Sequence, residues 1–166
     1  MASRSALLAG LLLIAAAPAV AATDPSFLLT ATAKDFASYF PAQLGNGYQS
    51  TLSSPRGTEG NLAYLVAFMD YAQDDISRPA AVPGWSEIDY STGDSPAGHF
   101  WLNQAALDPA VFQDYRQQLD MREGTLTTRY RYLDHGRTTR IEVTSLVSQA
   151  APHLAATRLS ITPEFD

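Results

Sequence analysis

The segment Asp114-Tyr115-Arg116-Gln117-Gln118-Leu119-Asp120-Met121-Arg122-Glu123-Gly124 and the run after it decide the fold. Residues 125–133 read Thr-Leu-Thr-Thr-Arg-Tyr-Arg-Tyr-Leu, and their side chains alternate with the two-residue period of a half-buried β-strand. The Asp-Met-Arg-Glu-Gly sequence before this run has the charges and the glycine of a tight turn. These residues predict a supporting β-meander rather than a catalytic site.

The last third of the chain continues this meander. The strand over 125–133 should bury one face, made of Leu126, Thr128, Tyr130 and Tyr132. Asp-His-Gly-Arg at 134–137 has hairpin composition, and the returning strand over 138–147 should bury Ile141, Val143 and Ser145. Leu146-Val147 breaks the alternation, which predicts a bulge or a change of face. A further strand over 153–162 has a similar slip near Thr157.

The first part of the chain carries shorter signals. Residues 27–32 predict a first strand, and residues 36–40 predict one helical turn. Gly45 and Gly47 flank Asn46 and allow a positive φ, which predicts a hairpin leading into a strand over 48–52.

The middle of the chain is harder to interpret. Residues 62–71 are strongly apolar and predict a buried strand, with a helix as the alternative. Residues 73–83 predict a polar loop and residues 99–102 a short strand. Residues 111–119 alternate without showing which face is buried.

Many short strands, frequent turns and no sustained helical period predict an all-β protein, an antiparallel β-sandwich. The 166 residues suffice for one domain, which we expect over residues 23–166. The net charge is −6 and no basic cluster is visible, so the sequence argues against binding to nucleic acid or anionic membranes.

Residues 1–22 have the features of a signal peptide. Arg4 gives the positive start, the apolar run over 7–17 is too short to span a bilayer, and Ala19-Val20-Ala21 fits a cleavage site. We therefore expect export to a bacterial periplasm or medium, with a retained anchor helix as the alternative. The chain has no cysteine, which suits a bacterial exported protein that folds without disulfides.

The sequence offers no recognisable catalytic constellation. Two carboxylates in a cleft can hydrolyse a glycosidic bond. The spacing pairs none of the candidates, which are Asp70, Asp74, Asp75, Glu87, Asp89, Asp94, Asp114, Asp120 and Glu123. The three histidines (His99, His135 and His153) lack the spacing of metal ligands. We predict no catalytic residue, no metal and no cofactor.

Two kinds of binding or structural residue remain as candidates. Trp85 and Trp101 are candidates for stacking on sugar rings, although aromatic residues in a sandwich mostly form its core. Asn46 is a further candidate for sugar binding. Asp120 and Arg122 are expected to form a turn cap or an ion pair.

Four segments carry a resemblance to a known family. They are Leu44-Gly45-Asn46-Gly47-Tyr48, Pro83-Gly84-Trp85, Tyr115 through Leu126 with its Leu-Asp-Met-Arg-Glu-Gly-Thr-Leu sequence, and the stretch from His153-Leu154-Ala155-Ala156 to Thr162-Pro163. In this order they resemble the N-terminal domain of glycoside hydrolase family 65, which includes acid trehalases and the maltose, trehalose and kojibiose phosphorylases. The resemblance assigns a structural role to Gly45, Gly47, Asp120, Arg122 and Gly124.

This resemblance implies a β-sandwich related to the galactose mutarotase-like supersandwich, incomplete at its C-terminal end. In the family this domain packs against an (α/α)6 barrel that holds the catalytic acid glutamate and binds the glucosyl disaccharide. No position of this chain matches that glutamate. The resemblance therefore implies a non-catalytic portion of an enzyme that processes glucosides.

Two hypotheses follow. The first is a non-catalytic part of an exported, trehalase-like α-glucoside hydrolase, or the same domain of a disaccharide phosphorylase. The second is a free-standing secreted carbohydrate-binding module that uses Trp85 or Trp101.

Overall fold

The computed structural model describes residues 24–58, 62–71, 77–91 and 101–165. Within these ranges the chain forms β-strands and three short 3-10 helices, and no described helix is long and apolar enough to span a membrane. The predicted signal peptide at residues 1–22 lies outside the described part of the chain.

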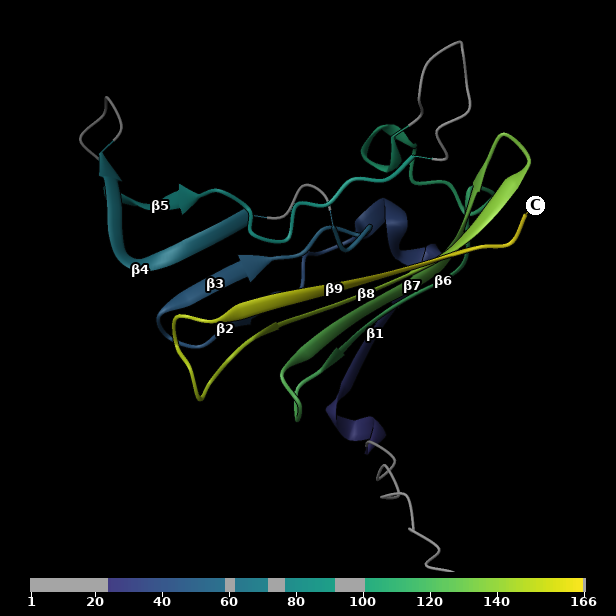
Figure 1. The fold of residues 1–166 in the computed structure, drawn as a ribbon. Helices are drawn as coiled ribbons and strands as arrows, with labels where there is room; N and C mark the ends of the chain where they lie inside the picture. The colour runs from purple at the N-terminus through teal and green to yellow at the C-terminus, as the bar shows by residue number, and fades with distance from the viewer. Residues whose placement is uncertain (1–23, 59–61, 72–76, 92–100, 166) are drawn as a thin grey trace, which may run out of the picture.

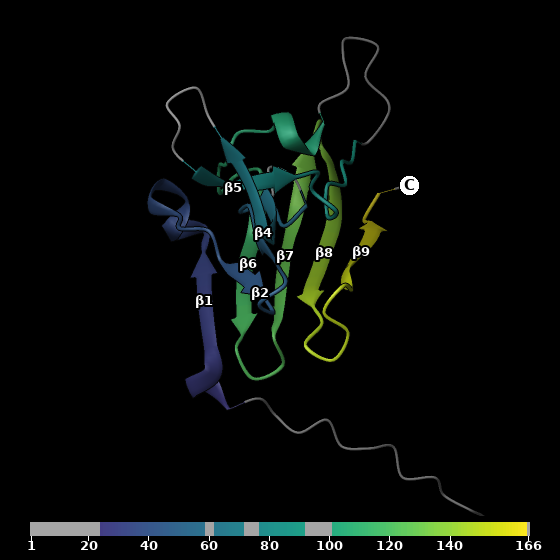
Figure 2. The same ribbon diagram turned by 90° about the vertical axis from the view of Figure 1, so that its left-hand side faces the viewer.

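The strands form two antiparallel sheets in two layers (Figure 1). Sheet A has the spatial order β1 (Leu28–Thr32), β6 (Phe112–Asp120), β7 (Thr125–Asp134), β8 (Arg137–Val147) and β9 (Ala155–Pro163). Sheet B has the order β2 (Gln43–Gly45), β3 (Gln49–Leu52), β4 (Leu62–Tyr71) and β5 (Ser77–Val82). The 3-10 helices are η1 (Pro25–Phe27), η2 (Ala33–Ser38) and η3 (Leu102–Gln104). Figure 2 shows sheet A face-on, with its strands side by side. The prediction of an all-β sandwich is confirmed.

The β7–β8 hairpin has the predicted form. Leu126, Tyr130 and Ile141 are buried on the inner face of sheet A. The turn between the strands places His135 at φ 49° and Gly136 at φ 80°. Two consecutive positive φ angles match the right-handed twist of the strands, so this turn fixes the register of the hairpin.

A bulge in β6 resolves the ambiguity of residues 111–119. Gln113 pairs with Arg131 and Arg116 pairs with Arg129, so Asp114 and Tyr115 together face one residue of β7. Asp114 has a φ of 53° and is exposed, whereas Tyr115 is buried. The extra residue shifts the alternation by one, which lets Phe112 and Tyr115 both point into the core.

Two predicted irregularities in β8 and β9 are wrong. Pairing of β8 with both neighbours is continuous through Leu146, and β9 pairs without a slip through Thr157. Ser145 occupies the inner face, where its hydroxyl lies 3.0 Å from the Thr157 hydroxyl. Because this hydroxyl pair satisfies two polar groups on the inner face, the strands keep their period despite the polar residues.

The predictions for the middle of the chain are partly wrong. Residues 62–71 form the predicted strand, β4, but only Ala63 is buried, and the strand's larger apolar side chains are partly or fully exposed. The segment predicted as a polar loop contains β5. Most of the predicted strand over 99–102 lies outside the described residues, and Leu102 begins η3 instead.

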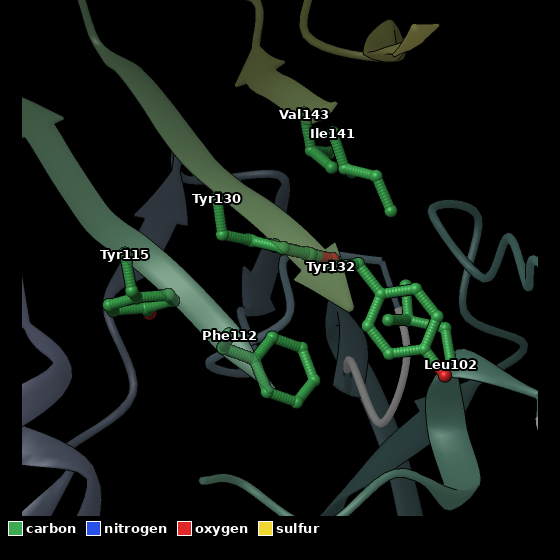
Figure 3. Close-up of a cluster of buried hydrophobic side chains, with 7 residues drawn as sticks. All are labelled: Leu102, Phe112, Tyr115, Tyr130, Tyr132, Ile141 and Val143. Carbon is green, nitrogen blue, oxygen red and sulfur yellow. The ribbon is translucent and has the colours of Figure 1, made fainter. Parts of the chain in front are cut away.

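The inner face of sheet A carries the main apolar core, shown in Figure 3. Its buried members are Leu102, Phe112, Tyr115, Tyr130, Tyr132, Ile141 and Val143. The rings of Phe112 and Tyr130 meet edge-on at 5.1 Å between centroids. Burial raises the pKa of Tyr132 to about 12, so its hydroxyl stays neutral at physiological pH.

A row of backbone carbonyls joins the segment after β3 to sheet A. The carbonyls of residues 54, 55 and 56 accept hydrogen bonds from Gln117 Nε2 (3.0 Å), the Tyr115 hydroxyl (2.8 Å) and the Tyr130 hydroxyl (3.1 Å). The Tyr39 hydroxyl shares its proton between the residue 53 carbonyl (2.9 Å) and Gln117 Oε1 (2.6 Å). We call these four groups, the carbonyls of residues 53–56, the carbonyl row. Each is paired, so the irregular segment can lie against the core without unsatisfied backbone.

Gly57 follows the carbonyl row and lies close to the sheet. Its φ is 84°, and a Cβ at this position would lie 2.8 Å from Thr128 Oγ1 and 3.3 Å from Val143 Cβ. A side chain here would therefore be strained by the backbone and would also push the segment away from β7 and β8.

We predict that Leu126→Ala or Ile141→Ala lowers the free energy of unfolding by about 2–5 kcal/mol, because each removes a buried side chain. Urea denaturation measures this loss. Leu154→Ala is the matched control, since Leu154 is 54% exposed. Unchanged midpoints in both core variants would contradict the assignment of the inner face.

A second prediction compares two glycines with the same φ of 84°. Gly47→Ala should cost only the backbone strain, about 1–2 kcal/mol, because no atom lies within 4 Å of the place that a Cβ would occupy. Gly57→Ala should cost about 1–3 kcal/mol more, because the methyl group meets Thr128. Equal losses in urea denaturation would show that the carbonyl row moves freely.

Candidate functional site

The two tryptophans predicted to bind sugar pack at different places. Trp85 is half-buried against the smaller core cluster of Leu44, Leu126 and Val147. Trp101 is 40% exposed and directly precedes Leu102, which belongs to the larger cluster. Sugar binding by either indole stays a prediction.

Asn46 joins the β2–β3 turn to the loop between β8 and β9. Its Nδ2 donates to the Ser148 carbonyl at 2.6 Å and to the Pro152 carbonyl at 3.0 Å. Its Oδ1 accepts the backbone N–H groups of Tyr48 and Gln49, both at 3.0 Å. Both ends of the amide are used within the protein, so the geometry gives Asn46 a structural role. Its predicted contact with sugar is untested.

Asp120 closes the turn between β6 and β7. Its Oδ1 accepts the backbone N–H groups of Arg122 at 2.9 Å and Glu123 at 3.0 Å. The Gly124 N–H donates to the Asp120 carbonyl at 2.9 Å, and Gly124 has a φ of 65°. The carboxylate thus organises the backbone of the turn. Arg122 contributes its N–H group there, and its side chain is exposed.

The candidate carboxylates are not gathered into a catalytic pair by any contact recorded among the described residues. Asp89 accepts the Tyr90 N–H, and Asp114 lies 3.9 Å from Arg131. Asp74, Asp75 and Asp94 lie outside the described residues, as does His99. In the part of the chain that the structure describes, no three His, Cys, Asp or Glu side chains form a group that could hold a metal ion.

Two carboxylates on the outer face of sheet A bind arginines. Glu142 accepts from Arg129 Nε at 2.9 Å and lies 3.5 Å from Arg158 Nη2. Glu164 lies 2.7 Å from Arg131 Nη2 and 2.8 Å from Arg140 Nη2. The hydrogen bond from Arg129 lowers the pKa of Glu142, and the one from Arg131 lowers the pKa of Glu164.

Exposed apolar side chains gather on β4 of sheet B. We call this region the β4–β5 surface. A hollow of about 690 Å³ opens there, and it is lined by Tyr64, Leu65, Val66, Phe68, Met69 and Pro79, with Arg78 among the polar groups. Val66 and Phe68 are 58% and 59% exposed, values more typical of polar residues in a folded domain.

A distortion in β4 shapes this surface. The pairing of β4 with β5 shifts register between Tyr64 and Met69, and Ala67 has a φ of 65°. A positive φ is uncommon for alanine. A shift of register of this kind is a β-bulge, and β-bulges bend a strand. Figure 1 shows β4 bending sharply along its length. The second half of β4 and its partner β5 therefore turn their apolar side chains outward.

Comparison with known protein families decides the identity of the domain. The model described as "Glycosyl hydrolase family 65, N-terminal domain" matches residues 74–166, more than half of the chain. The chain belongs to this family. No curated protein matches the chain.

The matched part of the family 65 domain runs from just before β5 to the end of the chain. It contains the turn capped by Asp120 and all of β6–β9. It does not contain Gly45, Asn46 or Gly47, although Asn46 bonds to Ser148 and Pro152 inside the matched part. Family 65 enzymes act on α-glucosides through their catalytic domain, and their N-terminal domain is non-catalytic.

The feature that sequence reasoning missed in this family 65 domain is the exposure of the β4–β5 surface. A continuous apolar run predicts burial on both faces of a strand. The signal in the sequence is the apolar run over 62–71. In the structure, the described residues bury only Ala63 of this run. An apolar strand without a cover indicates a surface that another structural element occupies.

We predict that acid destabilises the domain through Glu142 and Glu164. Both carboxyl groups have a folded-state pKa below the usual 4.5, so they bind protons less readily in the folded state than in the unfolded chain. Their contribution is present above about pH 4.5 and is lost as the pH falls through the lowered pKa values. Urea midpoints measured between pH 7 and pH 3 should fall accordingly.

Glu142→Gln should lower the midpoint at pH 7 and make the loss on acidification shallower. Glu123→Gln is the control, since Glu123 lies exposed in the β6–β7 turn and forms no ion pair with a described residue. The same pH dependence in wild type and Glu142→Gln would contradict the assignment.

Proposed function

We propose that the chain is the non-catalytic N-terminal β-sandwich portion of an exported, trehalase-like α-glucoside hydrolase of family 65. In this role it supports the catalytic (α/α)6 barrel and does not itself cleave a glycosidic bond. The β4–β5 surface is the observation that carries the proposal.

The free energy of burying apolar side chains favours a partner that covers the β4–β5 surface. Fully burying an aliphatic or aromatic side chain contributes about 1.5–3 kcal/mol relative to leaving it exposed. Val66, Phe68 and Met69 are each about half exposed, at 58%, 59% and 48%. Because they lie together around one hollow, a single partner surface can cover all three. In the family that the chain resembles, the domain that packs against this one is the (α/α)6 barrel, which we therefore propose as the partner.

The contacts of the described acidic residues favour a structural role for this domain. Asp120 holds a backbone turn, and Glu142 and Glu164 bind arginines on the sheet. Hydrolysis of a glycosidic bond needs two carboxyl groups facing each other across the sugar. In the family that the chain resembles, the catalytic acid belongs to the barrel.

Two features of the sequence support the exported hydrolase branch of the family. Residues 1–22 have the composition of a signal peptide. A phosphorylase retains the energy of the bond as a sugar phosphate, which is useful inside the cell. An exported member is therefore better suited to hydrolysis by a general acid and a general base.

The test combines the purified chain with a separately produced (α/α)6 domain of a family 65 trehalase. We expect no trehalose hydrolysis by the chain alone, and a complex in size-exclusion chromatography when both are mixed. Phe68→Ser with Val66→Ser should weaken the complex at least about tenfold, because it removes apolar contact area. Leu154→Ser is the control, an equally exposed apolar residue away from β4.

Two outcomes would overturn the proposal. Trehalose hydrolysis by the purified chain would make it an enzyme in its own right. Binding of glucosyl disaccharides by the chain alone, lost in Trp101→Ala or Trp85→Ala, would establish the free-standing carbohydrate-binding module instead.

A further inference from the structure

Sheet A places arginines opposite one another on its outer face. Arg116 of β6 is the register partner of Arg129 of β7, and Arg131 of β7 is the partner of Arg140 of β8. Directly opposed side chains in an antiparallel pair lie about 4.5–5.5 Å apart at Cβ, so like charges there are destabilising. The described strands of sheet A contain two such pairs on one face.

The two pairs differ in their compensation. Glu164 lies within 2.8 Å of both Arg131 and Arg140, which neutralises that pair. In the other pair, Arg129 binds Glu142, whereas Arg116 forms no ion pair or side-chain hydrogen bond with any described residue. Its register partner on the other side, in β1, is the uncharged Thr32, whose hydroxyl donates to Asp35. Among the described residues, Arg116 therefore has no carboxylate as an ion-pair partner, and it faces a second guanidinium.

The whole face is positive on an acidic protein. We call it the arginine face. It comprises Arg116, Arg129, Arg131, Arg140 and Arg158 and includes four carboxylates, Asp114, Asp120, Glu142 and Glu164. Five positive and four negative charges give +1, whereas the complete chain has −6. Figure 1 shows no described strand or helix packed against this side of β6–β9.

The neighbouring row of the same face supplies uncharged hydrogen-bonding groups. In register across the sheet, Thr30, Gln118, Thr127 and Thr144 lie next to the arginine rows. The hydroxyl oxygens of Thr127 and Thr144 lie 3.3 Å apart. A surface of guanidinium, hydroxyl and amide groups suits a polar protein interface.

We propose that the arginine face binds an acidic segment of a protein partner, with carboxylates seated at Arg116 and Arg129. Guanidinium groups bind carboxylates through paired N–H donors, and a carboxylate between these two arginines converts their repulsion into attraction. A nucleic acid fits less well, since its continuous phosphate charge meets Asp114, Glu142 and Glu164 and an acidic protein behind them. This inference is independent of the β4–β5 surface, which lies on sheet B.

The test uses the full chain with fluorescein-labelled poly-L-glutamate as the acidic probe. Binding is followed by fluorescence anisotropy at about 20 mM and about 150 mM salt, since screening weakens exposed charge pairs. We expect binding at low salt that weakens at higher salt. Arg116→Gln with Arg129→Gln should reduce the affinity roughly tenfold or more. Arg122→Gln, the same charge change in the exposed β6–β7 turn, should leave the affinity unchanged.

Thermal unfolding separates a binding role from a structural one. Because Arg116 opposes Arg129 without a carboxylate, Arg116→Gln should leave Tm unchanged or slightly raise it. Retained polyglutamate binding in the double variant, or no binding by the wild type at low salt, would overturn the proposal. Tighter binding of single-stranded DNA through the same two arginines would assign the face to nucleic acid and also overturn it.

Discussion

The attachment of the carbonyl row to sheet A is the constraint on which the two-layer arrangement depends. Four consecutive backbone carbonyls at residues 53–56 each accept a hydrogen bond from a side chain that is distant in sequence. Buried carbonyls without partners would cost about 1–3 kcal/mol each, so the segment can pack here only in this position. Gly57 then passes so close to Thr128 that its lack of a side chain is required. The β2–β3 hairpin is held at its other end by Asn46.

The carbonyl row and Asn46 hold one part of sheet B against sheet A. The rest of sheet B extends away from sheet A. Leu44 completes a small core with Leu126 and Val147, while β4 bends away after its first residues. The domain therefore has a firmly packed half and a projecting half with apolar side chains. The arginine face lies on the other side of sheet A. The family 65 domain thus offers two chemically different surfaces, one apolar and one cationic, to different partners.

Sequence reasoning predicted the parts of the fold that depend on local alternation. The inner face of β7, with Leu126 and Tyr130, follows directly from a two-residue period and a hairpin at residues 134–137. It failed at Leu146-Val147 and near Thr157, where it predicted irregularities although β8 and β9 pair continuously. It could not predict the exposure of β4, because apolar residues show a preference for burial but do not show which element is available to cover the strand. The arginine face needed the register of four strands, which no single segment contains.

The chemistry of the carbonyl row has a consequence for the conditions that the domain tolerates. Three of its donors are tyrosine hydroxyls, and the chain has no cysteine. Reducing agents therefore leave these hydrogen bonds intact. Burial raises the pKa of Tyr39 and Tyr115 above the usual 10, so their stabilising effect is complete below pH 10. It declines as the pH rises beyond that value, because the unfolded chain then loses its phenolic protons more readily than the folded domain. The hydrogen bonds that join the two layers are therefore insensitive to redox state and sensitive to strong alkali.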